Sequence, residues 1–146
     1  MEYTEEQRQH LYEKLKASIN EKPGFSVHND LKITKLEYGR CEGEVQIRPE
    51  SLNSIGIVHG GCLVSLADNV AGMAICSTGV NTITVDCSFS FLRAAKGSYV
   101  RCVAQPEKLG SKLAVIRCVL TDDQDKTVAT GQFTFLVTGE IGKKKS

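Results

Sequence analysis

The sequence lacks an excess of charge of either sign, because 18 Lys and Arg and 17 Asp and Glu leave its 146 residues with a net charge of +1. A surface that binds nucleic acid normally carries a basic excess or stripe, so we expect no nucleic-acid partner. The longest apolar segment, residues 62–76, is shorter than the roughly 20 residues that cross a bilayer. The chain opens with Met-Glu-Tyr-Thr-Glu-Glu instead of a basic segment followed by an apolar one. We therefore expect a cytoplasmic protein without membrane attachment.

The sequence also lacks the Cys-x-x-Cys spacing of metal and redox sites. Its six cysteines all lie in apolar segments: Cys41, Cys62, Cys76, Cys87, Cys102 and Cys118. Free cysteine packs as a small hydrophobic residue, so we expect reduced core thiols instead of disulfides or metal ligands. His59 and Cys62 are three residues apart, but with no further ligand nearby and an apolar segment behind them, packing is favoured.

Residues 62–76 are apolar almost all the way round a helix and follow the motif His59-Gly60-Gly61. This composition predicts a buried helix that other parts of the protein wrap. Asp68 interrupts it, and a carboxylate inside a buried helix costs several kcal/mol unless it is paired or shifts toward its neutral form. Asp68 therefore calls for an explanation.

The segment before this helix predicts an amphipathic helix over residues 4–21 and a β-hairpin over residues 31–48. The first helix has a capping box at its start, apolar residues at Leu11, Leu15 and Ile19, and a stop at Pro23-Gly24. Its apolar stripe needs a surface, either the protein's own sheet or a neighbouring subunit. The sequence leaves both open.

The segment after the helix predicts four strands. Residues 82–92 alternate most clearly, with Ile83, Val85, Cys87, Phe89 and Phe91 on one face and Thr84 among the polar residues on the other. Runs at 99–104, 113–120 and 128–137 follow after short turns, so we expect an antiparallel meander. The simplest way to bury the apolar helix is to curl this sheet around it, which gives an α+β fold.

The order of elements, together with Asn53-x-x-Gly56-x-x-His59-Gly60-Gly61 and the following Leu66-Ala67-Asp68, resembles the hotdog-fold acyl-CoA thioesterases, most closely the phenylacetate-pathway (PaaI-like) branch. The resemblance covers nearly the whole chain from about Gly24. It implies an antiparallel sheet of about five or six strands around the central helix. Together with the helix predicted above, this gives an N-terminal helix at 1–24 and a hotdog domain at 25–140, and the composition of residues 141–146 predicts a disordered basic tail. It also implies homo-oligomers, commonly tetramers built from dimers, with active sites at the dimer interface.

The resemblance further implies hydrolysis of an acyl- or aryl-CoA thioester to free acid and coenzyme A, with no metal and no cofactor, since coenzyme A is part of the substrate. Asp68 corresponds to the base or nucleophile, and Gly60 to the backbone N–H that polarises the thioester carbonyl. Asn53 and His59 shape that site, and Thr84 occupies a position where members often carry a hydroxyl.

The residue types fit this chemistry. A helix N-terminus offers unpaired N–H groups, and Gly60 and Gly61 have no Cβ to block a substrate carbonyl. One such donor is typically worth about 10²–10³ in rate. A tight turn into the helix also favours glycine, so the residue type alone leaves both explanations open. In the same way, His59 fits a helix cap, and Asp68 fits a polar contact that sets the register of two helices.

The spacing of Gly60 and Asp68 predicts a dimer. They are eight residues apart, which is roughly 12 Å along a helix, so they do not act on the same atom. If both serve one site, Asp68 comes from a second chain, with two helices antiparallel across a two-fold axis.

Coenzyme A carries phosphates, and Lys112 follows Gly110-Ser111 in a turn that can offer backbone N–H groups. We predict that Ser111 and Lys112 bind substrate phosphates, so that replacing Lys112 raises KM more than it lowers kcat. Two other functions stay open: a hotdog hydratase or dehydratase that uses His59 with Asp68, and a non-catalytic acyl-CoA sensor. The acyl group is not specified.

Overall fold

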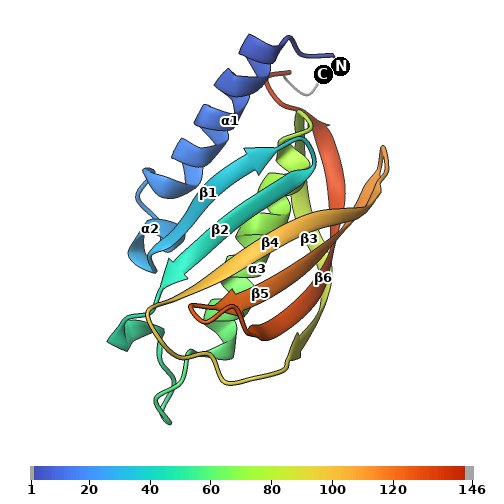
Figure 1. Ribbon diagram of the computed structural model, residues 1–146. Coiled ribbons are helices and arrows are strands. Elements are labelled where there is room, and N and C mark those ends of the chain that lie inside the picture. Colours follow the sequence, from blue (N-terminus) through green and yellow to red (C-terminus); the bar gives the residue numbers. More distant parts are fainter. Residues whose placement is uncertain (1, 144–146) are drawn as a thin grey trace.

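The computed structural model describes residues 2–143, which form three α-helices, one 3-10 turn and a six-stranded sheet (Figure 1). In chain order the elements are α1 (Glu5–Asn20), α2 (Phe25–His28), β1 (Leu31–Glu37), β2 (Arg40–Gln46), η1 (Pro49–Ser51), α3 (Gly60–Cys76), β3 (Val80–Phe91), β4 (Tyr99–Leu109), β5 (Leu113–Asp122) and β6 (Thr127–Glu140). The two longer predicted helices, the hairpin and the four later strands are therefore all present. β4 and β6 extend beyond their predicted ends at residues 104 and 137.

Helix α1 begins with the predicted capping box, in which the Gln7 N–H donates to Thr4 Oγ1 and the Thr4 N–H donates to Gln7 Oε1. Its apolar stripe packs on the protein's own sheet, where Leu11 is buried. At its last residue, the Asn20 side chain accepts from the Ile33 N–H and donates to the Ile33 C=O, each at 2.8 Å. The surface that the sequence left open is thus β1, beside α1 in Figure 1.

The sheet is antiparallel, with the strand order β1-β2-β4-β5-β6-β3. The predicted meander is confirmed for β4, β5 and β6. It is wrong for β3, which pairs with β6 at the far edge of the sheet instead of with β4. The place beside β4 is taken by β2, because the chain crosses the sheet with α3 before it enters β3.

Strand β3 contains a β-bulge at Val85. Thr84 pairs with Phe135 and Asp86 pairs with Thr134, so Val85 has no residue opposite it. The extra residue reverses the alternation, so Thr84 lies on the same face as the buried Phe135, toward α3. The predicted single apolar face for residues 82–92 is therefore wrong before the bulge.

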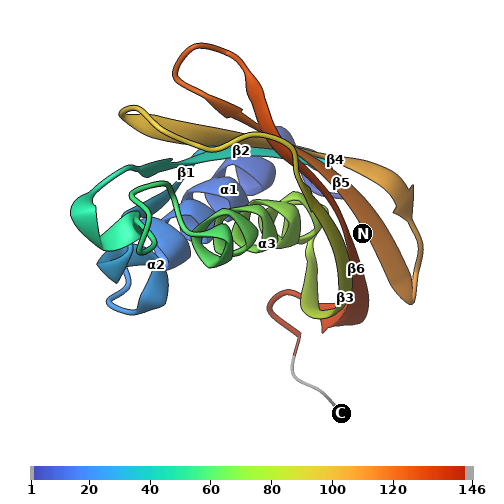
Figure 2. The ribbon, with the colours of Figure 1, turned by 90° about the horizontal axis from the view of Figure 1, so that it is seen from below.

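Within residues 2–143, helix α3 is covered on one side only. The residues that pack against the sheet are Leu63, Leu66, Ala67, Val70, Ala71, Ala74 and Ile75. Figure 2 shows the sheet arching over α3 and leaving the side away from the sheet open. Val64, Ser65, Asp68 and Gly72 lie along that side and stay partly exposed. The sequence predicted a helix surrounded by other structure. The chain's own sheet covers only one side of it.

All six cysteines are free. The expectation of core thiols is right for the four buried ones, Cys41, Cys76, Cys102 and Cys118. It is wrong for Cys87, which is exposed on β3. Burial raises the pKa of the Cys41 and Cys102 thiols, which keeps them protonated.

The predicted tail is described only in part. Ile141 donates its N–H to the Gly79 C=O, and Lys143 forms an ion pair with Glu140. Residues 144–146 lie outside the described residues. Within residues 2–143, no helix combines the length and the apolar character needed to cross a membrane.

Candidate active site

The N-terminus of α3 has one backbone donor left without a partner. The His59 ring accepts at Nδ1 from the Gly61 N–H at 2.8 Å, and the His59 C=O accepts from the Cys62 N–H at 2.9 Å. The N–H of Gly60, which lies between His59 and Gly61 in sequence, donates to no group within residues 2–143. The first backbone N–H groups of a helix have no partner within the helix, so a free N–H beside a cavity can donate to an anion or to a carbonyl oxygen of a ligand.

The two glycines serve different purposes. A Cβ on Gly61 would lie 3.0 Å from His59 Nδ1, so glycine there allows the ring to cap the helix. A Cβ on Gly60 would lie 3.1 Å from two atoms of the Phe91 ring, so glycine there allows close packing against β3. His59 therefore acts as a helix cap, and glycine at position 61 serves the turn into the helix. Of the residues at this end of the helix, only Gly60 keeps an N–H for a ligand.

Asn53 holds the loop that leads into α3. Its Oδ1 accepts from the Ile55 N–H at 3.1 Å and from the Ile57 N–H at 3.2 Å, and its own N–H donates to the Ile57 C=O at 2.8 Å. Its carbonyl oxygen is thus used within the loop. The side-chain NH₂ donates to no group in the described part of the chain and stays available to a ligand.

Asn53 and Gly60 line the same cavity, which has a volume of about 370 Å³. Leu63, Phe91 and Arg93 also line it. The structure thus brings two of the predicted site residues together, with a free amide donor, a free backbone donor and a guanidinium around one space.

Asp68 and Thr84 form a second pair. The Thr84 hydroxyl donates to Asp68 Oδ1 at 2.6 Å, across the gap between β3 and the partly exposed side of α3. This contact depends on the bulge at Val85, which turns the Thr84 side chain toward the helix. Because the hydroxyl occupies Oδ1, the other carboxylate oxygen remains free to accept a proton or attack a substrate.

Within one chain these two pairs do not meet. Gly60 and Asp68 are eight residues apart on α3, roughly 12 Å. Ser111 and Lys112 are farther away: the Lys112 C=O accepts from the Val137 N–H at the Thr82 end of β3, whereas Gly60 packs at the Phe91 end. Those ends are nine residues apart, roughly 30 Å along a strand.

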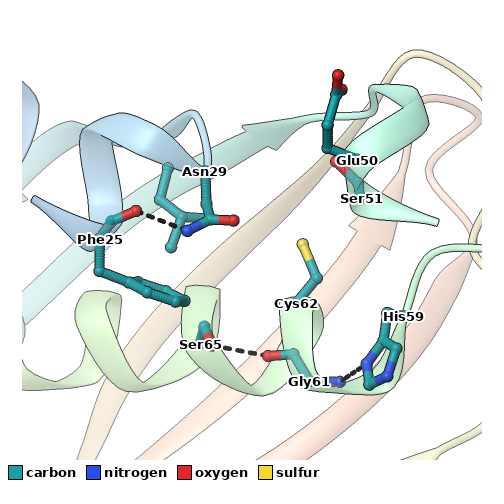
Figure 3. Close-up of a pocket in the computed structure, with 9 residues that line it drawn as sticks. Phe25, Asn29, Glu50, Ser51, His59, Gly61, Cys62 and Ser65 are labelled. Carbon is teal, nitrogen blue, oxygen red and sulfur yellow. Dashed lines mark hydrogen bonds between the residues drawn. The ribbon is translucent and has the colours of Figure 1, made fainter. Parts of the chain in front are cut away.

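A second cavity, of about 310 Å³, lies on the other side of the α3 N-terminus, between α3 and α2 (Figure 3). Phe25, Asn29 and Cys62 line it together with His59 and Gly61. Sequence reasoning missed this cavity, because a four-residue helix has no periodicity to detect. The available signal was the apolar pair Phe25 and Val27 directly after a predicted helix stop.

A long antiparallel sheet curved over one central helix defines this chain as a hotdog-fold protein. The family model described as "Thioesterase superfamily" matches residues 55–129. The chain therefore belongs to the thioesterase superfamily of PaaI-like hotdog proteins and is a thioester hydrolase.

Named relatives agree with this assignment. Acyl-coenzyme A thioesterase 13 of Homo sapiens is 29% identical over 130 residues, which cover 86% of this chain and 93% of the relative. The acyl-coenzyme A thioesterase PaaI of Escherichia coli is 30% identical over 98 residues, which cover 66% of this chain and 70% of the relative. The solved structure of E. coli PaaI, at 23% identity, has the same fold, with a TM-score of 0.83 over 90% of this chain and 96% of that one.

A hypothetical thioesterase of Streptococcus pneumoniae has been solved with coenzyme A. It matches with 27% identity and a TM-score of 0.72, over 75% of this chain and 90% of that one. Two further structures of the same protein carry alanine in place of an aspartate and of a threonine that are 16 positions apart. Asp68 and Thr84 are separated by 16 positions as well.

Proposed function

We propose that the protein is an acyl-CoA thioesterase whose site forms between two chains. The observation that supports this most directly is that α3 carries two different functional groups at two places. A free N–H lies at Gly60 beside Asn53, and a carboxylate bound by a hydroxyl lies at Asp68, some two helical turns away. Each half has one part of what hydrolysis of a thioester needs. The relatives named for acyl-CoA hydrolysis and the structure with coenzyme A support the substrate class.

The exposed surfaces favour a two-fold dimer through β3. This strand is a sheet edge of 12 residues, and Ile83 and Val85 on it are 54% and 51% exposed. Pairing β3 with its copy in antiparallel fashion continues the sheet and sets the open sides of the two α3 helices against each other. Asp68 of one chain then approaches Gly60 of the other. A homotetramer of two such dimers stays a prediction, which light scattering checks.

In this arrangement the thioester carbonyl oxygen accepts a hydrogen bond from the Gly60 N–H of one chain, next to the positive end of α3. Asp68 of the second chain acts on the carbonyl carbon, either by taking a proton from an attacking water or by direct attack. Thr84 fixes the orientation of that carboxylate by donating to Oδ1. The thiolate of coenzyme A then leaves. Attack by water gives the free acid in this step, whereas direct attack gives a mixed anhydride with Asp68, which water hydrolyses to release the acid.

The same dimer gives Lys112 a position. Antiparallel pairing of the β3 strands brings the Thr82 end of one chain to the Phe91 end of the other, so the Ser111–Lys112 turn of the second chain lies at the Gly60 end of the first. Arg93 already lines the Gly60 cavity. Both cations are thereby placed to bind coenzyme A phosphates, which supports the KM effect predicted for Lys112.

The decisive test is complementation between two inactive variants. Asn53→Ala and Asp68→Asn are each expected to lower kcat/KM by about 10²–10⁴. When the two chains are coexpressed, half of the dimers are mixed and each mixed dimer holds one intact site of two, so about a quarter of the parent activity returns. Thiol release from an acyl-CoA ester measures it.

The control is a mixture of Asp68→Asn chains with Asp68→Asn chains carrying a different affinity tag, which should recover nothing. A mixture of the two different variants that stays inactive, although light scattering shows dimers, would contradict the shared site. An inactive Asp68→Asn together with an indifferent His59→Ala would favour hydrolysis, whereas loss of activity in both variants would favour the hydratase alternative. Binding of acyl-CoA without thiol release by the parent protein would favour the sensor reading.

A further inference from the structure

Cys87 lies on the open edge strand β3 and has no role in the chemistry described so far. Its side chain is exposed, and its partner on β6 is the buried Phe133, so the thiol is on the side of the sheet that carries α3. No strand of residues 2–143 pairs with the outer side of β3. The thiol is thus placed where the proposed dimer sets a second chain.

The backbone of Cys87 is also available to a second strand. The N–H of Leu92 donates to the Val128 C=O, directly before β6, at 2.8 Å. Backbone groups point alternately to the two sides of a strand, so the even-numbered residues from Asp86 to Leu92 bond toward β6 and the odd-numbered ones point outward. Cys87 therefore presents its N–H and C=O at the open edge, as a residue in a hydrogen-bonded pair with a new strand must.

The two halves of the proposed site indicate where the two-fold axis crosses β3. The axis brings Gly60 of one chain to Asp68 of the other, so it passes midway between these two positions. Gly60 is level with Phe91, whose ring would lie 3.1 Å from a Cβ on that glycine, and Asp68 is level with Thr84, which bonds it. The midpoint of these two levels lies next to Cys87.

The length of the helix gives a second value for the same midpoint. Gly60 and Asp68 are roughly 12 Å apart along α3, which equals about three to four residues of a strand. Counted from Thr84, the midpoint is then near Asp86, so the two values bracket Asp86 and Cys87. An axis at Asp86 would set two carboxylates directly opposite each other, which is unfavourable, whereas an axis at Cys87 sets two neutral side chains there.

Resting on the dimer of the proposed function, we propose that the axis passes at Cys87, so that its thiol faces the thiol of a second copy, and that oxidation joins the two in a disulfide that holds the catalytic dimer together. Opposite residues of a hydrogen-bonded antiparallel pair have Cα atoms about 5.5 Å apart, within the roughly 4.4–6.8 Å that a disulfide spans. The linked chains cannot separate on dilution, so the bond keeps the shared site assembled.

Oxidised glutathione is a sufficient oxidant for this step. The thiolate of one Cys87 attacks its S–S bond, which forms a mixed disulfide and releases one reduced glutathione. The thiolate of the second Cys87 then attacks the protein sulfur of that mixed disulfide and releases the other. Two protein thiols are thereby oxidised to one disulfide, and one glutathione disulfide is reduced to two thiols.

The test incubates the parent protein with oxidised glutathione and follows the covalent dimer on denaturing gels without reductant. The parent and Cys62→Ala, which removes a half-buried thiol, are expected to yield the dimer, and Cys87→Ala is expected to yield none. The linked dimer should keep thiol release from acyl-CoA within about twofold of the reduced parent, and should keep it at nanomolar protein as well. Dithiothreitol should return it to single chains on the gel.

The matched control moves the thiol three residues along the same strand. In Cys87→Ala with Ser90→Cys, the two thiols lie about 10 Å from the axis in opposite directions, so they are roughly 20 Å apart. Ser90 is exposed, so the new thiol should take up glutathione without linking the chains.

Equal dimer yields from this variant and the parent, or a Cys87 that takes up glutathione without linking the chains, would overturn the facing pair. A linked dimer that is inactive until reductant is added would overturn its identity with the catalytic dimer. Complementation between Asn53→Ala and Asp68→Asn without a linked Cys87 would reject the facing pair and leave the proposed function in place. A linked dimer from a parent that releases no thiol would reject the proposed function instead.

Discussion

The sheet has two edge strands, β1 and β3, and they differ in what lies against their outer sides. β1 has seven residues, and α1 packs beside it. The Asn20 side chain pairs with both backbone groups of Ile33, as a neighbouring strand would. β3 has 12 residues with exposed Ile83 and Val85, and no element of residues 2–143 pairs with its outer side.

An uncovered strand edge is a template for pairing, and proteins normally cover it, shorten it or place charges on it. This chain covers and shortens β1 and leaves β3 long, with Ile83 and Val85 exposed on it. Both strands carry a bulge, at Thr34 in β1 and at Val85 in β3, so irregularity alone does not distinguish them. The difference favours the proposed pairing of β3 with a second copy of the chain, and Thr84 on the same strand binds the Asp68 carboxylate that the proposal assigns to the shared site.

The largest effect is expected from a charge placed on the open edge strand, which tests whether β3 is the dimer interface. Val85→Lys is expected to cost several kcal/mol of association through burial and like-charge contact, which is about 10²–10³ in the dimer Kd. Activity at nanomolar protein should fall with it. Sedimentation and thiol release measure both effects.

The matched control places the same charge on the covered edge. Thr34→Lys changes an exposed bulge residue of β1 and should alter stability by no more than about 0.5 kcal/mol. Equal loss of assembly in both variants, or in neither, would show that β3 is not the interface.

A smaller effect is expected from the hydroxyl that β3 contributes. Thr84→Val removes a hydrogen bond to a charged group, worth about 1.5–3 kcal/mol, so kcat should fall about 10- to 100-fold with the dimer intact. Thr84→Ser keeps the hydroxyl and should retain most of the rate. A Ser variant as slow as the Val variant would argue against the hydrogen bond as the cause.

The hydrogen bonds that cover the edge of β1 can also be removed by mutation. Asn20→Ala leaves the N–H and C=O of Ile33 without their partner and should lower the free energy of unfolding by about 1–3 kcal/mol in urea titrations. Asn81→Ala is the counterpart on β3, where the side chain makes one exposed hydrogen bond of 3.4 Å to the Glu140 C=O. It should cost clearly less, and the reverse order would contradict the role of Asn20.

The smallest expected effect is on the pH dependence of the free energy of unfolding. It distinguishes a buried thiol near the covered edge strand from an exposed thiol on the open edge strand. Burial raises the pKa of Cys41 above its unfolded value of about 8.5, so its contribution is fully present below pH 8.5 and is lost as pH rises toward the folded pKa. At pH 9.5 the loss is about 1.4 kcal/mol for this thiol. Urea titrations at pH 7.5 and 9.5 should show it. Cys41→Ala should remove it, whereas Cys87→Ala, which changes an exposed thiol, should not.

Much of the fold was predictable because it is encoded in local periodicity. The capping box at Thr4 and the apolar run of α3 gave correct elements, and the alternation of β5 and β6 gave correct strands. The edge position of β3 was not predictable, because pairing partners far apart in sequence leave no local signal and a short connection favours neighbours. The open side of α3 escaped prediction for a related reason, since composition tells that a helix is covered and not which chain covers it.

The site followed the same division. Asn53 and Gly60 are close in sequence and share a cavity, as the motif spacing predicts. That Thr84 faces Asp68 depends on one extra residue in β3, and a pattern of alternation alone assigns it the other face. That Gly61 gives its N–H to His59 is a matter of ring orientation, which residue type does not determine.

The crossing that carries β3 past the other strands also sets an order of events during synthesis. β3 spans residues 80–91, but its partner β6 is completed only at Glu140. At about 5–20 residues per second, β3 waits several seconds with both of its edges unpaired. The hydroxyl of Thr84 reaches Asp68 only once β6 has docked beside β3, so this contact waits for the last strand of the sheet to be synthesised.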